Sequence, residues 1–345
     1  MKVTSASVDF PAALATVREG GSLDAETSAR VFETIMTGQV PEADLIAFLT
    51  AQARRGPTVP EIVGAVSSMR AAMRPITAAA GAIDLCGTGG DGLGTLNIST
   101  AVSFVVAGAG VTVAKHGNRS ASSKSGAADI LEALNVRIDL EPSRASEVLA
   151  ETGIVFLFAQ LHHPAMRHVG KARAMIKQRT IFNLLGPLAS PARVKHQLVG
   201  IYSKDWLMAY AEALKALGST RALVVHGADG LDELTTTDVT FYASLENGVI
   251  TTGTFAPEDA GLQRATLPKL KGGTPAENAE KLIALFDGER GAYRDIVLMN
   301  AGAALMVADA AREIKDGVAI AAQSLDSGAA KAKLEALIAA SNNPK

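Results

Sequence analysis

The chain has 345 residues, a length that allows about two domains or one large α/β domain. Hydrophobic residues make up 48% of the sequence and charged residues 20%, which is typical of a folded globular protein and not of disorder or membrane spans. The 33 Lys and Arg and 35 Asp and Glu give a net charge of −2, which disfavours binding to nucleic acid or anionic lipid through a basic surface. The single cysteine, Cys86, excludes an intramolecular disulfide framework, and the N-terminal segment lacks a secretory-signal pattern, so we expect a cytoplasmic protein.

Residues 7–74 predict a run of short amphipathic helices, because apolar residues recur there at helical spacing. Glycine and proline interrupt the pattern at Gly20-Gly21, Gly38–Pro41 and Arg55–Pro60. We therefore expect a small helical domain over residues 1–78.

From Ala82 the pattern changes to short strand-like runs that alternate with helices. The runs AIDLC, VTVAK and GIVFLF enclose predicted helices over 99–108 and 125–134, which indicates βαβ units and a mostly parallel sheet. A helical stretch near 162–190 contains no strand and is a candidate to pack back onto the first helical block.

The strand pattern resumes at QLVGIYS and continues through a predicted helix over 204–217 and the strand RALVVHG. The segment VTFYASLENGVITTG predicts a hairpin that turns at 246–248, because Asn-Gly tolerates the positive φ angles of a tight turn. From Thr274 onward the chain is Ala-rich and helical, with breaks expected near Gly317 and Ser327. The fold class is α/β, with a small N-terminal helical domain and a larger domain over 79–345 built on a mostly parallel sheet.

A glycine-rich loop follows the first predicted strand, in DLCGTGGDGLGTLNIST. Glycines let the backbone approach a ligand, and the helix that opens near Ser99 adds unpaired N–H donors, so we interpret the loop as a phosphate site. Asp91 indicates that a metal or a sugar hydroxyl accompanies the phosphate. The spacing matches neither GxxxxGK[ST] nor GxGxxG, which disfavours ATP and NAD. The alternative is a glycine-rich turn without a ligand.

A second polar loop, in VTVAKHGNRSASSKSGAADILEALN, also joins a predicted strand to a helix. It carries Lys115, Arg119 and Lys124 among Asn and Ser donors. Because neighbouring parallel strands present their carboxyl ends at one edge of a sheet, the two loops are expected to bind one ligand with several phosphates. A solvated basic loop is the alternative.

The next polar segment is a helix with His162, His163 and His168. A zinc site is disfavoured there, because adjacent helical histidines point about 100° apart and no Cys or carboxylate joins them at ligand spacing. Arg173 on the same helix either binds a substrate carboxylate through its planar guanidinium or is an ordinary surface arginine.

The segment VVHGADGLDELTTTD places four carboxylates after a predicted strand: Asp229, Asp232, Glu233 and Asp238. Adjacent carboxylates repel each other unless a cation lies between them, and Mg²⁺ shared with a pyrophosphate meets that need. The segment alone is equally compatible with an acidic surface turn, but two phosphate loops favour the metal.

Four long motifs, in this order, resemble the anthranilate phosphoribosyltransferase family: DLCGTGGDG with NIST, KHGNRSASSKSGAADILEAL, HHPAMRHV with RTIFNLLGPL, and GLDE. The resemblance spans nearly the whole chain. It implies that the amine of anthranilate displaces pyrophosphate from phosphoribosyl pyrophosphate (PRPP), a reaction of tryptophan biosynthesis. It also implies a helical and an α/β domain similar to those of pyrimidine nucleoside phosphorylases, a homodimer formed through the helical domains, and two Mg²⁺ ions per subunit with the pyrophosphate.

The resemblance also assigns roles to residues. PRPP would be held by Gly87, Gly90, Asp91, Thr95, Asn97, Ile98, Ser99 and Thr100. The segment that would close over the phosphates consists of Lys115, His116, Gly117, Asn118, Arg119, Ser120, Ala121, Ser122 and Ser123. Anthranilate would contact Asn118 and Arg173, and magnesium would be held by Ser99, Asp232 and Glu233.

Three positions depart from the family pattern. Ala127 stands at a substrate-contacting position where the family usually has serine, so one donor is missing there. Gln160 replaces a usual proline and Lys177 a usual glycine. None of these changes removes a group that the chemistry needs.

Displacement at the anomeric carbon develops positive charge on the sugar and negative charge on the leaving pyrophosphate. We therefore expect catalysis by positioning and electrostatics, with Lys115 stabilising the departing charge. His116 is the nearest candidate for a general base, although the reaction does not require a strong one. Two alternatives remain: a pyrimidine nucleoside phosphorylase on the same fold, which needs no metal pair, and a nucleic-acid-binding relative, which should present a basic face.

Overall fold

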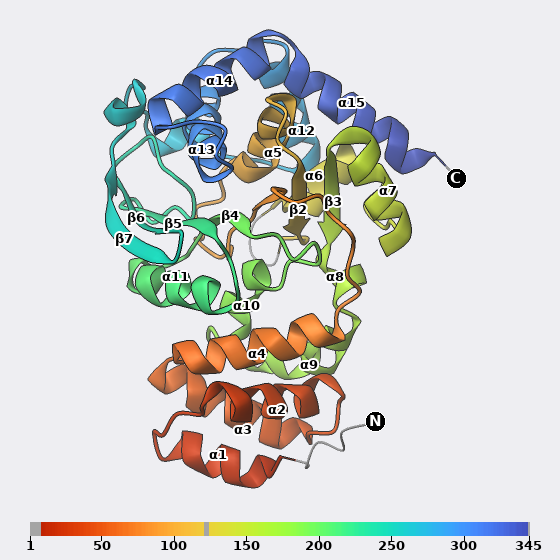
Figure 1. Ribbon diagram of the computed structural model, residues 1–345, viewed down its shortest axis with the longest axis vertical. Coiled ribbons are helices and arrows are strands. Elements are labelled where there is room, and N and C mark those ends of the chain that lie inside the picture. The colour runs from red at the N-terminus through yellow and green to blue at the C-terminus, as the bar shows by residue number, and fades with distance from the viewer. Residues whose placement is uncertain (1–7, 121–123, 344–345) are drawn as a thin grey trace. The chain divides into compact units, whose positions relative to one another are not determined.

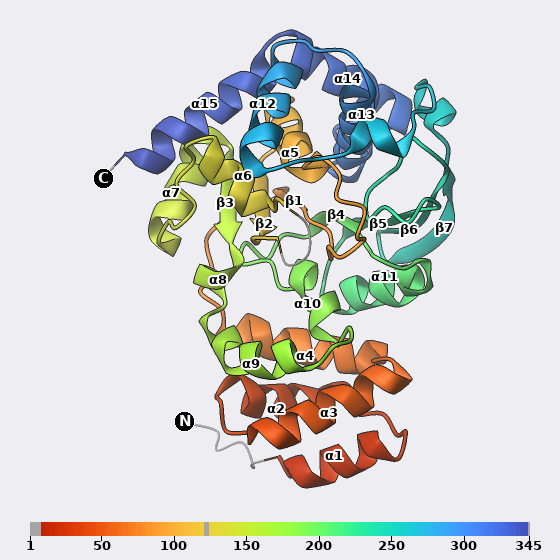
Figure 2. The same cartoon turned by 180° about the vertical axis from the view of Figure 1, so that it is seen from behind.

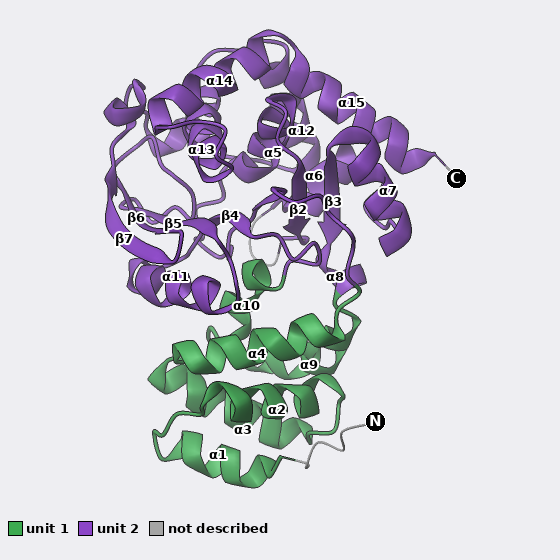
Figure 3. Ribbon diagram, in the orientation of Figure 1, with its two compact units in different colours: residues 1–74, 163–189 green, residues 75–162, 190–345 purple. Residues whose placement is uncertain are grey.

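The computed structural model describes residues 8–120 and 124–343 and divides into two compact units (Figure 3). Unit 1 comprises Met1–Arg74 and His163–Ala189, and unit 2 comprises Pro75–His162 and Ser190–Lys345. Unit 1 is helical and unit 2 contains a sheet with helices around it (Figure 1), so the predicted fold class is confirmed. Within the described residues, no helix is long and apolar enough to cross a membrane.

Unit 1 is built from short helices with polar caps. The Thr58 hydroxyl and the Glu61 carboxylate cap the fourth helix reciprocally, and Glu61 also pairs with Arg55 at 2.6 Å. The segment His163–Ala189, from the middle of the chain, returns to this unit and packs its helix α9 against α2 and α3. The α-helices of unit 1 are α1 (Phe10–Arg18), α2 (Ala25–Met36), α3 (Glu42–Arg55), α4 (Val59–Ala72), α9 (Arg167–Met175) and α10 (Phe182–Leu188).

The sheet of unit 2 has the strand order β3-β2-β1-β4-β5-β6-β7. Strands β3, β2, β1, β4 and β5 run parallel, and β6 and β7 are antiparallel additions. The chain builds outward from β1 in one direction and then from β4 in the other, so the strand order reverses between β1 and β4, where open α/β sheets bind ligands. The strands are β1 (Ile83–Leu85), β2 (Val113–Gly117), β3 (Ile154–Phe158), β4 (His196–Gly200), β5 (Arg221–Gly227), β6 (Thr240–Glu246) and β7 (Val249–Phe255).

Helices cover both faces of this sheet. Helices α5 and α13 lie on one face and α11 on the other, as the two opposite views show (Figures 1 and 2). The core between them is apolar, and the parallel strands are almost entirely buried, as expected for a sheet with both faces covered. The α-helices of unit 2 are α5 (Ile98–Gly108), α6 (Ala127–Ala133), α7 (Pro142–Thr152), α8 (Ala159–His162), α11 (Leu207–Ala216), α12 (Pro275–Phe286), α13 (Ala292–Val307), α14 (Ile314–Asp326) and α15 (Ala329–Asn342).

The predicted hairpin is confirmed, since β6 and β7 are joined by Asn247 and Gly248 with φ angles of 50° and 80°. The sequence analysis missed α7, whose amphipathic pattern starts at a proline in the first turn. The break expected near Gly317 is wrong, because Gly317 lies inside α14. Its missing side chain lets α14 approach α13 closely: a Cβ at Gly317 would lie 2.3 Å from the Gly302 carbonyl oxygen.

Candidate active site

The glycine-rich loop leaves β1 at its carboxyl end and leads into α5. Four of its glycines, Gly89, Gly90, Gly92 and Gly94, have positive φ angles between 62° and 81°, a conformation that side chains disfavour. Gly87 leaves room for a neighbouring carboxylate, because a Cβ at this position would lie 2.8 Å from Asp232 Oδ2. The loop therefore needs glycine both for its turns and for the close approach of a carboxylate.

That carboxylate belongs to an acidic pair that contacts both ends of the loop. Asp232 Oδ2 accepts a hydrogen bond from the Gly89 N–H at 2.8 Å, and Glu233 Oε1 accepts one from the Ser99 N–H at 3.2 Å. Gly200 at the end of β4 makes room for this turn, since a Cβ there would clash with the Asp232 backbone. The loop after β5 and the loop after β1 thus form one site at the carboxyl edge of the sheet.

The other two carboxylates of the acidic turn, Asp229 and Asp238, have other partners. Asp229 accepts hydrogen bonds from the hydroxyls of Thr235 and Thr237 at 2.7 and 2.5 Å and so stabilises the turn itself. Asp238 accepts from the Val239 N–H and lies 3.6 Å from Arg264. Of the four carboxylates, only the adjacent pair hydrogen-bonds to the glycine-rich loop.

The ionised form of the acidic pair is disfavoured in the structure without a cation. Burial, with a smaller contribution from the neighbouring Asp91, raises the pKa of Asp232 to about 7. Burial and then the charge of Asp232 raise the pKa of Glu233 to about 8. A cation between these groups would favour their ionised forms. Together with the hydroxyl of Ser99, the pair offers the oxygen donors that Mg²⁺ prefers, so the donor set fits magnesium.

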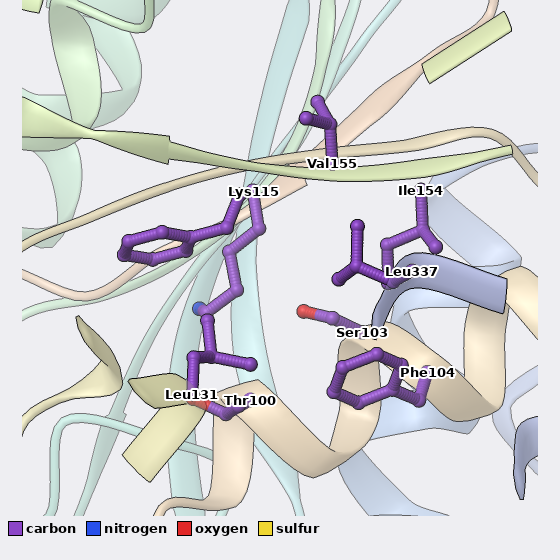
Figure 4. A pocket seen from close by; sticks show the side chains of 9 residues that line it. Thr100, Ser103, Phe104, Lys115, Leu131, Ile154, Val155 and Leu337 are labelled. Carbon is purple, nitrogen blue, oxygen red and sulfur yellow. The ribbon is translucent and has the colours of Figure 1, made fainter. Parts of the chain in front are cut away.

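Lys115 lies beneath the loop, on β2. Its side chain is only 4% exposed, and its ammonium donates to the Leu85 carbonyl and, at 3.1 Å, to Ser99 Oγ. Beside it is a cavity of about 10 Å³, where Thr100, Ser103 and Phe104 from α5 face Lys115 (Figure 4). That volume is at the lower limit for one water molecule, so this cavity is a packing gap and not a ligand site.

His116 follows Lys115 on the strand, and its ring is 3% exposed. Ligand atoms of Asp84, Cys86 and His116 lie within 4.8 Å of one another, and the backbone N–H of His116 donates to Asp84 Oδ1 at 2.9 Å. Desolvation raises the pKa of the partly exposed Cys86 thiol, so the thiol is protonated and a poor metal ligand. The role of His116 as a general base stays a prediction.

The second loop is held by α6. The Asp129 carboxylate accepts from the N–H groups of Ser120 and Gly126 at 3.2 and 2.8 Å. Arg119 pairs with Asp129 at 3.0 Å and with both oxygens of Glu132, so its guanidinium is directed to α6. The predicted ligands Ala121, Ser122 and Ser123 lie outside the described residues.

The remaining predicted residues of the two loops are placed by contacts within the loops and with neighbouring segments. Asn97 accepts from Asn278 at 2.8 Å and donates to the Ser125 carbonyl at 3.2 Å, so it joins the two loops. Asp91 accepts from the Leu93 N–H at 3.0 Å. The side chain of Asn118 accepts from the Arg119 N–H at 2.8 Å and from Gln160 at 3.5 Å. Thr95 forms a β-bridge with Lys271. Ile98 and Thr100 are buried. Gly117 is the last residue of β2, and Ala127 is the first residue of α6.

Arg173 belongs to unit 1. It lies near the end of α9, and its guanidinium stacks over the Phe182 ring at 5.5 Å from the centroid. Arg173 is partly buried, and this burial lowers the pKa of its guanidinium. A planar, partly desolvated guanidinium suits a carboxylate ligand.

The sequence analysis missed the segment that fixes the far side of the glycine-rich loop. The Leu96 N–H donates to the Leu270 carbonyl, the Gly272 N–H to the Gly94 carbonyl, and Lys271 Nζ to the Leu93 carbonyl at 2.6 Å. A Cβ at Gly272 would lie 2.5 Å from the Thr95 carbonyl oxygen. The signal in the sequence is the Gly272-Gly273 pair directly before a capping box at Thr274.

Comparisons with known proteins agree with this geometry. Residues 11–73 match the model of the glycosyl transferase family, helical bundle domain, and residues 79–331 match that of the glycosyl transferase family, a/b domain. The anthranilate phosphoribosyltransferase of Rhodopseudomonas palustris is 52% identical over 97% of this chain and 99% of its own length. That of Azorhizobium caulinodans is 54% identical over 95% of both chains. The chain belongs to the anthranilate phosphoribosyltransferase family.

Solved structures of anthranilate phosphoribosyltransferases share the fold. The enzyme from Thermus thermophilus superposes with a TM-score of 0.91 at 42% identity, covering 96% of this chain and 99% of that one. The enzyme from Saccharomyces cerevisiae, solved in complex with PRPP and Mg, has a TM-score of 0.88 at 26% identity and covers 97% of this chain and 98% of that one.

Proposed function

We propose that this protein transfers the phosphoribosyl group of PRPP to the amine of anthranilate, giving N-(5-phosphoribosyl)anthranilate and pyrophosphate in tryptophan biosynthesis. Membership of the anthranilate phosphoribosyltransferase family supports this reaction. The observation that carries the proposal is the acidic pair, which hydrogen-bonds to both ends of a glycine-rich loop at the strand-order reversal. Such an arrangement suits a metal-bound pyrophosphate, and the nucleoside phosphorylase alternative does not need it.

In the proposed reaction, a bond forms between the amine nitrogen and the anomeric carbon while the bond from that carbon to pyrophosphate breaks. The N–H groups of the glycine-rich loop and of the α5 N-terminus would bind the departing pyrophosphate. Lys115 would hold the Ser99 hydroxyl in place and add positive charge beneath it. Asp232, Glu233 and Ser99 would hold Mg²⁺, which when bound neutralises charge on the pyrophosphate.

Anthranilate carries a carboxylate beside its amine, and two residues are proposed to recognise it. Arg173 would pair with the carboxylate through its planar guanidinium, which the Phe182 ring already orients. Asn118 would contact the ring substituents from the second loop. The segment from Lys115 to Ser123 is proposed to close over the phosphates.

Three finer points belong to the same proposal. Two Mg²⁺ ions would bind per subunit, as the family resemblance implies, and the acidic pair and Ser99 would supply the protein's oxygen donors. A homodimer would form through the helical unit, and the protein would act in the cytoplasm. Calorimetric counting of metal ions and sedimentation of the purified protein test the first two points.

A fluorescence time course of anthranilate with PRPP tests the reaction, run with Mg²⁺ and with a chelator. The proposal predicts metal-dependent loss of anthranilate with one pyrophosphate released per anthranilate consumed. Consumption of a pyrimidine nucleoside with inorganic phosphate, and not of anthranilate, would contradict it.

A further inference from the structure

The acidic pair lies between two residues whose backbone groups are both hydrogen-bonded. On one side, the Leu231 N–H donates to Asp229 Oδ1 at 3.1 Å, and the Leu231 carbonyl accepts from the Gly227 N–H at 2.8 Å. Both of these partners belong to the same turn. On the other side, Leu234 is held by Asn300, a residue of α13 that lies 66 positions further along the chain. Asn300 therefore anchors the backbone of the acidic pair to a distant element of unit 2.

Asn300 contacts the Leu234 backbone at two points. Its Oδ1 accepts from the Leu234 N–H at 2.9 Å, and its Nδ2 donates to the Leu234 carbonyl at 2.8 Å. Nδ2 also donates to the Ile296 carbonyl at 2.9 Å, one turn earlier in α13, which ties the amide to its own helix. Asn300 and Leu234 are both fully buried. The amide thus uses its oxygen and both of its N–H groups, and the two backbone groups of Leu234 determine its orientation.

Leu234 directly follows Glu233, one of the two carboxylates of the acidic pair. The Cα atoms of consecutive residues are about 3.8 Å apart, so a shift of the Leu234 backbone is passed to Glu233. Glu233 in turn accepts from the Ser99 N–H at the start of α5, and α5 packs against α13 on the same face of the sheet (Figure 1). Asn300 therefore acts on the Glu233 carboxylate and on its hydrogen bond to α5 without touching either group.

Magnesium places strict demands on the position of such a carboxylate. Mg²⁺ requires near-ideal octahedral geometry with oxygens at about 2.0–2.1 Å, and two ionised carboxylates repel each other until a cation binds. Each carboxylate must therefore be held by the groups behind it. We propose that Asn300 is a positioning residue that fixes the Glu233 carboxylate for magnesium through the Leu234 backbone. This inference rests on the proposed function, because it assigns the acidic pair to the metal.

Two variants of Asn300 test the proposal. Asn300→Leu is similar in size and removes every hydrogen bond of the amide. Asn300→Asp keeps the shape and the acceptor of the Leu234 N–H, but it offers at most one donor to the two carbonyl groups, so it serves as the test variant if Asn300→Leu does not fold. The thermal transition of each variant verifies that it is folded.

Thr152→Val is the matched control. The buried Thr152 hydroxyl also contacts both backbone groups of a single residue, because it donates to the Ile154 carbonyl at 2.7 Å and accepts from the Ile154 N–H at 3.2 Å. Ile154 is the first residue of β3, so this contact lies at the amino edge of the parallel strands and not at the acidic pair. The control therefore removes a comparable buried contact of unit 2 without acting on Glu233.

Hydrogen exchange of the Ser99 N–H, measured by mass spectrometry on the protein without substrates, is the first test. The proposal predicts that this amide exchanges about tenfold faster or more in the Asn300 variants than in wild type, because its acceptor Glu233 is no longer fixed. Exchange in Thr152→Val should stay within about twofold of wild type. Equal exchange rates of the Ser99 N–H in the Asn300 variants and in Thr152→Val would overturn the proposal.

The second test is the Mg²⁺ concentration that gives half-maximal consumption of anthranilate at saturating substrates. It should rise by about tenfold or more in the Asn300 variants, while the KM for anthranilate stays within about twofold of wild type. Faster exchange at Ser99 with an unchanged Mg²⁺ requirement would overturn the proposal, and so would an equal rise of the Mg²⁺ requirement in Thr152→Val. If wild-type protein consumes no anthranilate, the proposed function fails, and the exchange of the Ser99 N–H still decides whether Asn300 positions Glu233.

Discussion

The two loops at the carboxyl edge of the sheet are held in different ways. The loop after β1 is fixed by distant segments: the acidic pair, the segment 270–272 and Asn278. Among the described residues of the loop after β2, its own helix holds the loop through Asp129 and Glu132, and Ser125 bridges to Asn97. The first loop is thus preorganised by the tertiary fold, as electrostatic stabilisation of a leaving group requires. The second is a local unit whose disruption should affect substrate binding more than turnover.

The largest effect is expected when the acidic pair is neutralised. Asp232→Asn with Glu233→Gln should lower kcat by roughly 10³-fold or more at saturating substrates, because the metal ligands act on the departing charge. Steady-state kinetics with Mg²⁺ give the measurement. Asp238→Asn in the same turn is the control and should retain near-wild-type turnover, and wild-type-like turnover in the double variant would remove the metal assignment.

This contrast also separates what a sequence can reveal from what it cannot. The strand over 221–227 and the Asn247-Gly248 turn follow from local patterns, and the structure has both. The four carboxylates of the acidic turn are equivalent by local pattern, and only the tertiary fold directs two of them to the loop. The supports from Lys271 and Asn278 were missed for the same reason, since each reaches the loop across more than 170 residues of sequence.

A smaller effect is expected in the second loop. Asp129→Ala removes the acceptor of two backbone N–H groups. We therefore expect the KM for PRPP to rise by about tenfold with a smaller change in kcat. The free energy of unfolding should fall by about 1 kcal/mol. Glu132→Gln is the matched control, because it weakens only an exposed ion pair and should change KM by less than about twofold. A fall in kcat as large as that of the acidic-pair variant would abolish the distinction between the loops.

Substitutions of Arg173 test the proposed carboxylate site, which neither loop supplies. Arg173→Ala should raise the KM for anthranilate by about 10–100-fold with little change in the KM for PRPP, since it removes a charge-assisted hydrogen bond. Arg173→Lys should recover only part of this loss, because an ammonium cannot form the paired geometry. An unchanged KM for anthranilate in both variants would move the carboxylate site elsewhere.

The smallest expected effect is a pH dependence of the thermal stabilisation of the protein by Mg²⁺. The folded-state pKa values of Asp232 and Glu233, about 7 and about 8, lie above their ordinary values. The protonated carboxyl groups therefore contribute to folding stability at low pH. This contribution to stability is lost as pH rises through about 7–8. Mg²⁺ binds the ionised pair, so it should raise Tm more at about pH 8 than at about pH 6. Thermal unfolding with and without Mg²⁺ measures this difference, which the acidic-pair variant should lack. An equal rise at both pH values would argue against these groups as ligands.

The most direct measurement is the crystal structure of this protein with PRPP and Mg²⁺. The account predicts pyrophosphate density against the N–H groups of the glycine-rich loop, with magnesium bound by Asp232, Glu233 and Ser99. Pyrophosphate bound at another place in the fold, or magnesium that contacts neither carboxylate, would contradict it.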